Sequence, residues 1–149
     1  MEAYLIATAC TKFEKKADQT FKSLTEEVYC DLLKSAKVEN GNMIGQAWFG
    51  NCGMGTFGQN NIRGQVCFTP LVQKKLFPER VGLINVEGGC ATGSMAFHGA
   101  WKDVISGTED VSLAIGVEKI YQPNQPEKIQ EIYDGGIDQF DRNEWLEFY

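Results

Sequence analysis

The sequence predicts an α/β fold, with a mostly parallel sheet, flanking helices and a buried central helix. Short apolar runs alternate with longer segments of helical period, in the order strand, helix, strand, helix, strand, helix, strand. Such an order favours parallel strands, because each helix returns the chain to the same end of the sheet. The chain has 149 residues, of which 43% are hydrophobic, and this suffices for one domain with its own core.

The chain begins with an apolar strand and an amphipathic helix. Residues 3–13 are apolar on both faces, as in a buried parallel strand. Residues 18–38 have helical period, and Asp18 or Thr20 is the expected cap. The apolar stripe of this helix consists of Phe21, Leu24, Val28, Leu32 and Ala36.

A turn, a strand, a loop and a second helix come next. The turn at 40–42 leads into a strand at 43–51, and a glycine-rich loop follows at 50–61. Residues 62–77 are expected to be partly helical. Pro70 must cap, kink or interrupt that helix, because it has no backbone N–H.

The last strand–helix–strand unit contains the helix expected to be buried. A strand at 80–89 precedes a helix at 91–107, which Gly107 closes, and a fourth strand follows at 110–120. Close packing on several sides is predicted for this helix, since it has small residues at Ala91, Gly93, Ala96, Gly99 and Ala100.

The pattern changes after Ile120. Residues 121–149 contain two prolines, many acids and aromatic residues without a clear period. We expect an α/β domain over 1–120, and the start of a loop or covering region over 121–149. Another part of the protein should cover the apolar residues near the terminus, which are Phe140, Trp145, Leu146, Phe148 and Tyr149.

Composition excludes several classes of function. The net charge is −6 and no basic cluster is present, which argues against a nucleic-acid surface. The apolar run near the N-terminus is too short to span a membrane and lacks the basic start of a signal peptide. The cysteines show no C-x-x-C spacing, so neither a metal site nor a disulfide framework is indicated; they are Cys10, Cys30, Cys52, Cys67 and Cys90. Free thiols are typical of a cytoplasmic protein.

Cys90 differs from the other cysteines in its surroundings. It lies in "VEGGCATGSMA", between the end of a strand and the start of a helix. Ligands gather at the carboxyl ends of parallel strands, and a helix N-terminus favours a thiolate. Gly88 and Gly89 permit a sharp turn and close backbone approach. Cys90 is therefore a candidate nucleophile.

Two segments resemble the thiolase superfamily. "NVEGGCATGSMAFHGAWKDVISGTEDVSLAIGVEK" (85–119) is similar to its nucleophile segment, and "GQNNIRGQ" (58–65) resembles the GQNPARQ-like stretch that precedes it. "CATGS" resembles the sterol-carrier-protein-type thiolases and acetyl-CoA acetyltransferases. The resemblance covers about residues 3 to 120 and implies the N-terminal half of a thiolase fold.

The resemblance implies an acyltransferase. Cys90 would take an acyl group as a thioester, and its backbone would help to form an oxyanion hole. A 3-oxoacyl-CoA and CoA would give acetyl-CoA, or another shortened acyl-CoA, and a second acyl-CoA by a ping-pong reaction. The reaction would then belong to the degradation of lipids or aromatic acids through acyl-CoA intermediates. No metal or redox cofactor is implied for this chain; the coenzyme A thioester is the substrate.

The family also uses two histidines and a second cysteine from a C-terminal half. This chain has one histidine, His98, eight residues beyond Cys90 on the same predicted helix, or about 12 Å along its axis. We therefore expect the chain to be incomplete as an enzyme. The implied partners are a C-terminal half or complementary chain, a second copy in a homodimer or larger oligomer, and a zinc-ribbon/OB-fold companion.

Two alternative functions remain open at this stage. A thiolase-like aldolase acting on a β-hydroxyacyl-CoA would not need Cys90 as a nucleophile. A non-catalytic scaffold subunit would use the fold for assembly only. Four further residues are interpreted as structural, although each is expected near the strand ends or the loop: Cys52, Arg63, Glu87 and Glu118.

Overall fold

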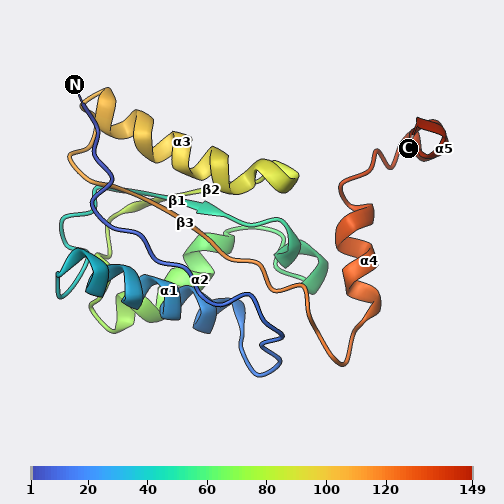
Figure 1. Cartoon of the computed structure of the whole chain (residues 1–149), viewed down its shortest axis with the longest axis horizontal. Coiled ribbons are helices and arrows are strands. Elements are labelled where there is room, and N and C mark those ends of the chain that lie inside the picture. The colour runs from blue at the N-terminus through green and yellow to red at the C-terminus, as the bar shows by residue number, and fades with distance from the viewer. Residues whose placement is uncertain (1, 149) are drawn as a thin grey trace.

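The structure is a computed structural model that describes residues 2–148, and it forms three layers (Figure 1). A parallel sheet of three strands lies between α3 on one face and α1 with α2 on the other. The strands are β1 (Gln46–Gly50), β2 (Gly82–Val86) and β3 (Ser112–Gly116). The helices are α1 (Phe21–Ala36), α2 (Arg63–Gln73), α3 (Thr92–Ile105), α4 (Glu127–Asp134) and α5 (Arg142–Phe148), with short 3-10 turns η1 (Gly53–Phe57) and η2 (Gly89–Ala91). The predicted α/β fold with a parallel sheet and flanking helices is confirmed.

The order of the strands brings their carboxyl ends together. β1 is central, and both β2 and β3 pair with it in parallel. In this register Gly50 lies opposite Val86 on one side and Gly116 on the other. The segments that follow the three strands therefore start at one edge of the sheet.

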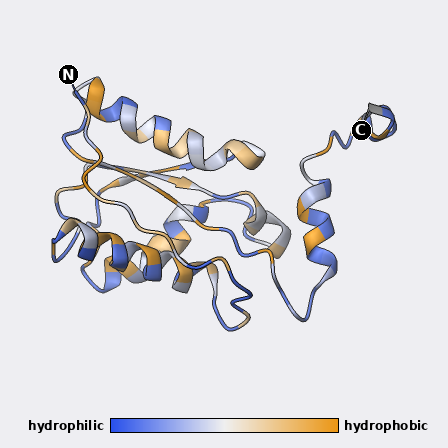
Figure 2. Cartoon of the chain, in the orientation of Figure 1, coloured by the Kyte–Doolittle hydropathy of each residue, from blue (hydrophilic) through white to orange (hydrophobic). Residues whose placement is uncertain are grey.

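Helix α1 begins at a capping box. The Thr20 hydroxyl accepts a hydrogen bond from the Ser23 N–H, and the Ser23 hydroxyl accepts one from the Thr20 N–H. Of the two predicted caps, Thr20 is the one used. Along α1, hydrophobic residues alternate with hydrophilic ones (Figure 2), and the deepest positions are Leu24, Thr25, Tyr29 and Leu33.

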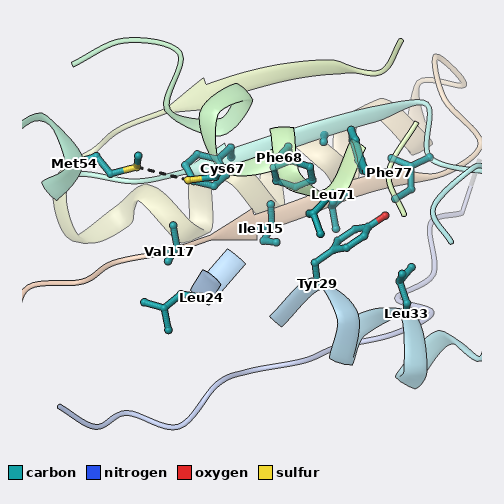
Figure 3. Packing of buried hydrophobic residues seen from close by; sticks show 14 residues of the cluster. Leu24, Tyr29, Leu33, Met54, Cys67, Phe68, Leu71, Phe77, Ile115 and Val117 are labelled. Carbon is teal, nitrogen blue, oxygen red and sulfur yellow. Dashed lines mark hydrogen bonds between the residues drawn. The ribbon is translucent and has the colours of Figure 1, made fainter. Parts of the chain in front are cut away.

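Aromatic residues from three segments form the core under the sheet (Figure 3). The rings of Phe68 and Phe77 meet edge to face with centroids 4.5 Å apart, and Tyr29 lies 5.8 Å from Phe68. Each such buried side chain stabilises the fold by about 1.5–3 kcal/mol relative to exposure. Phe68 and Leu71 belong to α2, which continues through Pro70 without interruption.

The expected strand at 3–13 is wrong. Within the described part of the chain, no backbone hydrogen bond joins this segment to β3, although β3 has no other neighbour on that side. Tyr4, Leu5 and Ile6 remain exposed. A groove of about 480 Å³ separates the segment from β3, with α1 and α3 as its other walls. An apolar run becomes a strand only where a partner lies at pairing distance, about 4.8 Å.

The helix predicted to be buried is α3, and one of its faces is buried in this chain. Ala96, Gly99 and Ala100 pack against the sheet. Asp103 ties the helix to two strands, because its carboxylate accepts from the Trp48 indole N–H and from the Ser112 hydroxyl, both at 2.7 Å. Away from this face, three large apolar residues of α3 are exposed: Phe97 and Trp101, which border the groove, and Met95, which lies beside Gly88.

The tail contains more helix than predicted. The sequence predicts the start of a loop or covering region over 121–149. In the structure, α4 and α5 occupy part of this range and lie beside the main body (Figure 1). Ile132 of α4 packs against Gly53 of η1. Across residues 2–148, no helix is both long and apolar enough to cross a bilayer.

Candidate active site at the carboxyl ends of the strands

Three segments converge at the carboxyl edge of the sheet. Asn51 and Cys52 follow β1, residues 87–91 follow β2, and Glu118 follows β3. The convergence results from the parallel order, which places every strand end at the same edge.

Cys90 lies in the η2 turn, immediately before α3, and is exposed. The two glycines before it meet different requirements. Gly89 has φ +57°, a conformation that residues with side chains rarely adopt. A Cβ at Gly88 would come within 2.2 Å of the Met95 sulfur. The predicted sharp turn is therefore present, and the thiol after it is accessible.

Thr92, the first residue of α3, holds this turn together. Its hydroxyl accepts from the Gly88 N–H at 2.9 Å and donates to the Gly89 carbonyl at 2.8 Å. Its methyl group faces Gly50, where an added Cβ would lie 2.9 Å away. Thr92 is not among the site residues predicted from the sequence, although its place two residues after the cysteine is the available signal.

Cys52 lies beside the same turn. Its Sγ is 3.2 Å from the Gly89 carbonyl oxygen and 3.0 Å from the Thr92 hydroxyl oxygen. Burial raises the pKa of the Cys52 thiol, and the Thr92 hydrogen bond opposes this shift. The sequence favours a structural loop thiol for Cys52, near the strand ends, and the structure places this thiol against the turn that carries Cys90.

The two glutamates of the site bind backbone amides. Glu118 accepts from the N–H groups of Cys52 and Gly53, the latter at 3.1 Å, and Glu87 accepts from the Gly89 N–H at 2.7 Å. Desolvation raises the pKa of Glu118, whereas the two amides and Arg63 lower it. These contacts agree with the structural role predicted for both glutamates.

Asn51 and Arg63 fix the loop after β1. The buried Asn51 amide donates to the Val117 carbonyl at 2.6 Å, and its oxygen accepts from the Met54 N–H at 2.9 Å. Arg63 donates to the Asn51 carbonyl at 2.7 Å, consistent with the structural role predicted for it. Asn51 was not anticipated, because its partner is 66 residues away in the sequence.

His98 lies outside this cluster. It is exposed on α3, and its ring stacks on Trp101 with centroids 5.4 Å apart. Among residues 2–148, no group of three or more potential ligands could hold a metal ion. The site thus consists of an accessible thiol on a tightly bonded turn, and the histidine of this chain is not part of it.

A cysteine between a parallel strand and a helix, with its turn fixed by neighbouring loops, defines an α/β protein suited to covalent chemistry on sulfur. The family description "Thiolase, N-terminal domain" matches residues 3–139. The chain belongs to the thiolase family and corresponds to its N-terminal domain.

Two curated proteins resemble the chain over most of its length. It is 32% identical over 117 residues to the benzoylsuccinyl-CoA thiolase subunit BbsB of Thauera aromatica. It is 33% identical over 122 residues to an acetyl-CoA acetyltransferase of Methanocaldococcus jannaschii. Each match covers 78% of this chain but 28% of the relative, so the chain spans under a third of the length of these proteins.

Proposed function

We propose that the chain carries the nucleophile of an acyl-CoA thiolase, and that Cys90 is the acyl acceptor. The Cys90 thiolate attacks the 3-oxo carbon of a 3-oxoacyl-CoA, and a sulfur–carbon bond forms. The bond between C2 and C3 then breaks, and the enolate of acetyl-CoA leaves and takes a proton from a group outside this chain, which gives acetyl-CoA. In the second step the thiolate of CoA takes the acyl group from Cys90 and frees the cysteine.

The observation that carries this proposal is the exposure of Cys90 on a turn whose backbone is fixed. Gly88, Gly89 and Thr92 hold the turn through the hydrogen bonds at 2.9 and 2.8 Å. A backbone N–H held at such a turn stabilises the oxyanion of a tetrahedral intermediate without reorganisation. We assign this role to the Cys90 N–H.

The proposal requires groups from outside this chain. The site contains no histidine, because His98 lies on the outer face of α3 beside Trp101. We propose that a C-terminal half or a complementary chain supplies two histidines and a second cysteine. A homodimer or larger oligomer, a zinc-ribbon/OB-fold companion, a covering role for residues 121–149 and a cytoplasmic location remain predictions.

The names of the relatives suggest which substrates to try. One relative is named for benzoylsuccinyl-CoA and the other for acetyl-CoA. An aromatic and a short aliphatic acyl-CoA are therefore the two classes to compare.

Acyl transfer to the thiol can be tested on the chain itself. Incubation with acetyl-CoA should add one acetyl group at Cys90, found by intact mass and peptide mapping. The Cys90→Ala variant should lose this adduct. Cys10→Ala is the matched control, because Cys10 is the other exposed cysteine, and this variant should keep the adduct.

Absence of any adduct at Cys90 even with the complementary chain present, together with no preferential labelling of Cys90 by iodoacetamide, would contradict the proposal and favour a scaffold subunit. The aldolase alternative makes a different prediction for the assembled enzyme, which would then retain its activity in the Cys90→Ala variant.

A further inference from the structure

Two donors from different segments meet on one carbonyl group, that of Gly89. The Thr92 hydroxyl donates to it at 2.8 Å, and the Cys52 sulfur lies 3.2 Å from the same oxygen. Gly89 is the residue immediately before Cys90. Because Gly89 has no side chain and adopts φ +57°, the conformation of this peptide depends on hydrogen bonds from its neighbours.

The direction of the Gly89 carbonyl fixes the direction of the Cys90 N–H. Peptide bonds across residues 2–148 are trans, so the carbonyl and the following N–H point in opposite directions. With the carbonyl held toward Cys52 and Thr92, the Cys90 N–H points away from them. Rotation of this one peptide plane would move the proposed oxyanion donor.

Cys52 is itself held in place from both sides. Glu118 accepts hydrogen bonds from the Cys52 and Gly53 N–H groups. Arg63 donates to the Cys52 carbonyl at 3.4 Å. Burial raises the pKa of the Cys52 thiol, which keeps its S–H available as a donor.

We infer that Cys52 is a positioning residue for acyl transfer to Cys90. Its thiol donates to the Gly89 carbonyl and thereby directs the Cys90 N–H toward the oxyanion, while Glu118 anchors Cys52. The inference rests on the proposed role of Cys90 as acyl acceptor. The two cysteines then have opposite tasks, one as an attacking thiolate and the other as a protonated donor.

Two reactions at Cys90 separate positioning from plain reactivity. With p-nitrophenyl acetate, the thiolate attacks the carbonyl carbon, an oxyanion forms, and nitrophenolate leaves as the carbon–oxygen bond breaks. With iodoacetamide, the thiolate displaces iodide and no oxyanion forms. Site-resolved mass spectrometry gives both rates at Cys90, each divided by the rate at exposed Cys10 of the same chain.

The Cys52→Ala variant should lower the ratio of acetylation to alkylation at Cys90 by about tenfold, because loss of a whole oxyanion donor costs about 10²–10³ in rate. Cys52→Ser restores a donor and should recover most of the ratio. Glu118→Gln, which weakens the anchor without changing the turn, should lower it as well. Cys30→Ala is the matched control, since Cys30 is a half-buried cysteine of α1, and it should leave the ratio unchanged.

A ratio within about twofold of wild type in both Cys52→Ala and Glu118→Gln overturns the inference and leaves the proposed function standing. If wild-type Cys90 is acetylated no faster than Cys10 even with the complementary chain present, the proposed function fails and this inference fails with it. A Cys52→Ala chain that loses its circular-dichroism signal leaves the decision to Cys52→Ser and Glu118→Gln.

Discussion

Tyr29 is a fully buried residue with a polar group in the core. Its exposed fraction is 0%, and its hydroxyl donates to the Leu76 carbonyl at 3.0 Å. Burial raises the pKa of Tyr29 above the ordinary value of 10.0. The hydroxyl therefore stays protonated in the folded chain at pH values where the unfolded chain ionises.

This residue predicts a dependence of stability on pH. Above about pH 10 the unfolded state loses a proton that folded Tyr29 retains, so wild-type stability falls as the pH rises. Tyr29→Phe should be less stable by about 1 kcal/mol near neutral pH, because it lacks the hydrogen bond. The difference in unfolding free energy between the two chains should shrink at about pH 11, because only wild type loses the stability that depends on a protonated Tyr29.

Urea unfolding of both chains at about pH 8 and about pH 11 measures this difference. A gap of equal size at the two pH values would contradict the raised pKa.

Site residues could be predicted from the sequence where the residues that determine their conformation are close to them in the chain. The turn before Cys90 follows from consecutive glycines at a strand end. Asn51 and Cys52 were not predictable in the same way, because their partners lie 66 and 40 residues away. Such contacts depend on strand order, which periodicity does not specify.

At the scale of elements, α3 contains two glycines in opposite environments. An added Cβ at Gly99 would lie 2.4 Å from the Trp48 ring, whereas one at Gly93 would meet nothing within 4 Å. The ring cannot move away easily, since the Trp48 indole N–H is bonded to Asp103 at 2.7 Å. Gly99 thus sets how closely α3 approaches the sheet.

Alanine at these two positions should have opposite effects. Gly99→Ala should destabilise the fold by about 1–3 kcal/mol through overpacking. Gly93→Ala should stabilise it by about 0.5–1 kcal/mol, because alanine favours helix over glycine. Thermal unfolding followed by circular dichroism measures both, and a Gly99→Ala chain as stable as Gly93→Ala would refute the close contact.

The helices and strands were predicted well where each one packs against or pairs with a neighbouring element. The prediction was poor for the segment that has no paired neighbour. The predicted ranges for α1, α3 and the three paired strands overlap the observed elements. The run at 3–13 has the composition of a strand but no hydrogen-bonded neighbour among the described residues. The residue types of a segment determine its tendency to form a strand, whereas hydrogen-bonded pairing also requires another strand beside it.

At the scale of the whole molecule, the outer face of α3 is an apolar surface open to solvent. Phe97 and Trp101, which lie one helical turn apart and border the groove beside residues 3–9, are 54% and 42% exposed. Contiguous apolar surface of this kind marks an interaction site in soluble proteins. The sequence predicted a helix buried on several sides, and this chain alone buries one of them.

Removal of this apolar surface should be visible in dye binding. Phe97→Lys combined with Trp101→Lys should lower the fluorescence of an added hydrophobic dye by about half or more, without lowering the melting temperature. Ser35→Lys is the control, because it adds a lysine at an exposed position of α1. Equal dye fluorescence in all three chains would show that the face does not bind apolar ligands.

His98 gives this face a property useful in the laboratory. It is the one histidine in the sequence, and its ring stacks on Trp101 at an interplanar angle of 15°. Its imidazole proton resonances in a nuclear magnetic resonance spectrum therefore need no assignment. The ring current of the indole shifts those resonances. A molecule that binds at α3 and disturbs the stacked pair therefore changes the chemical shift of the His98 ring protons.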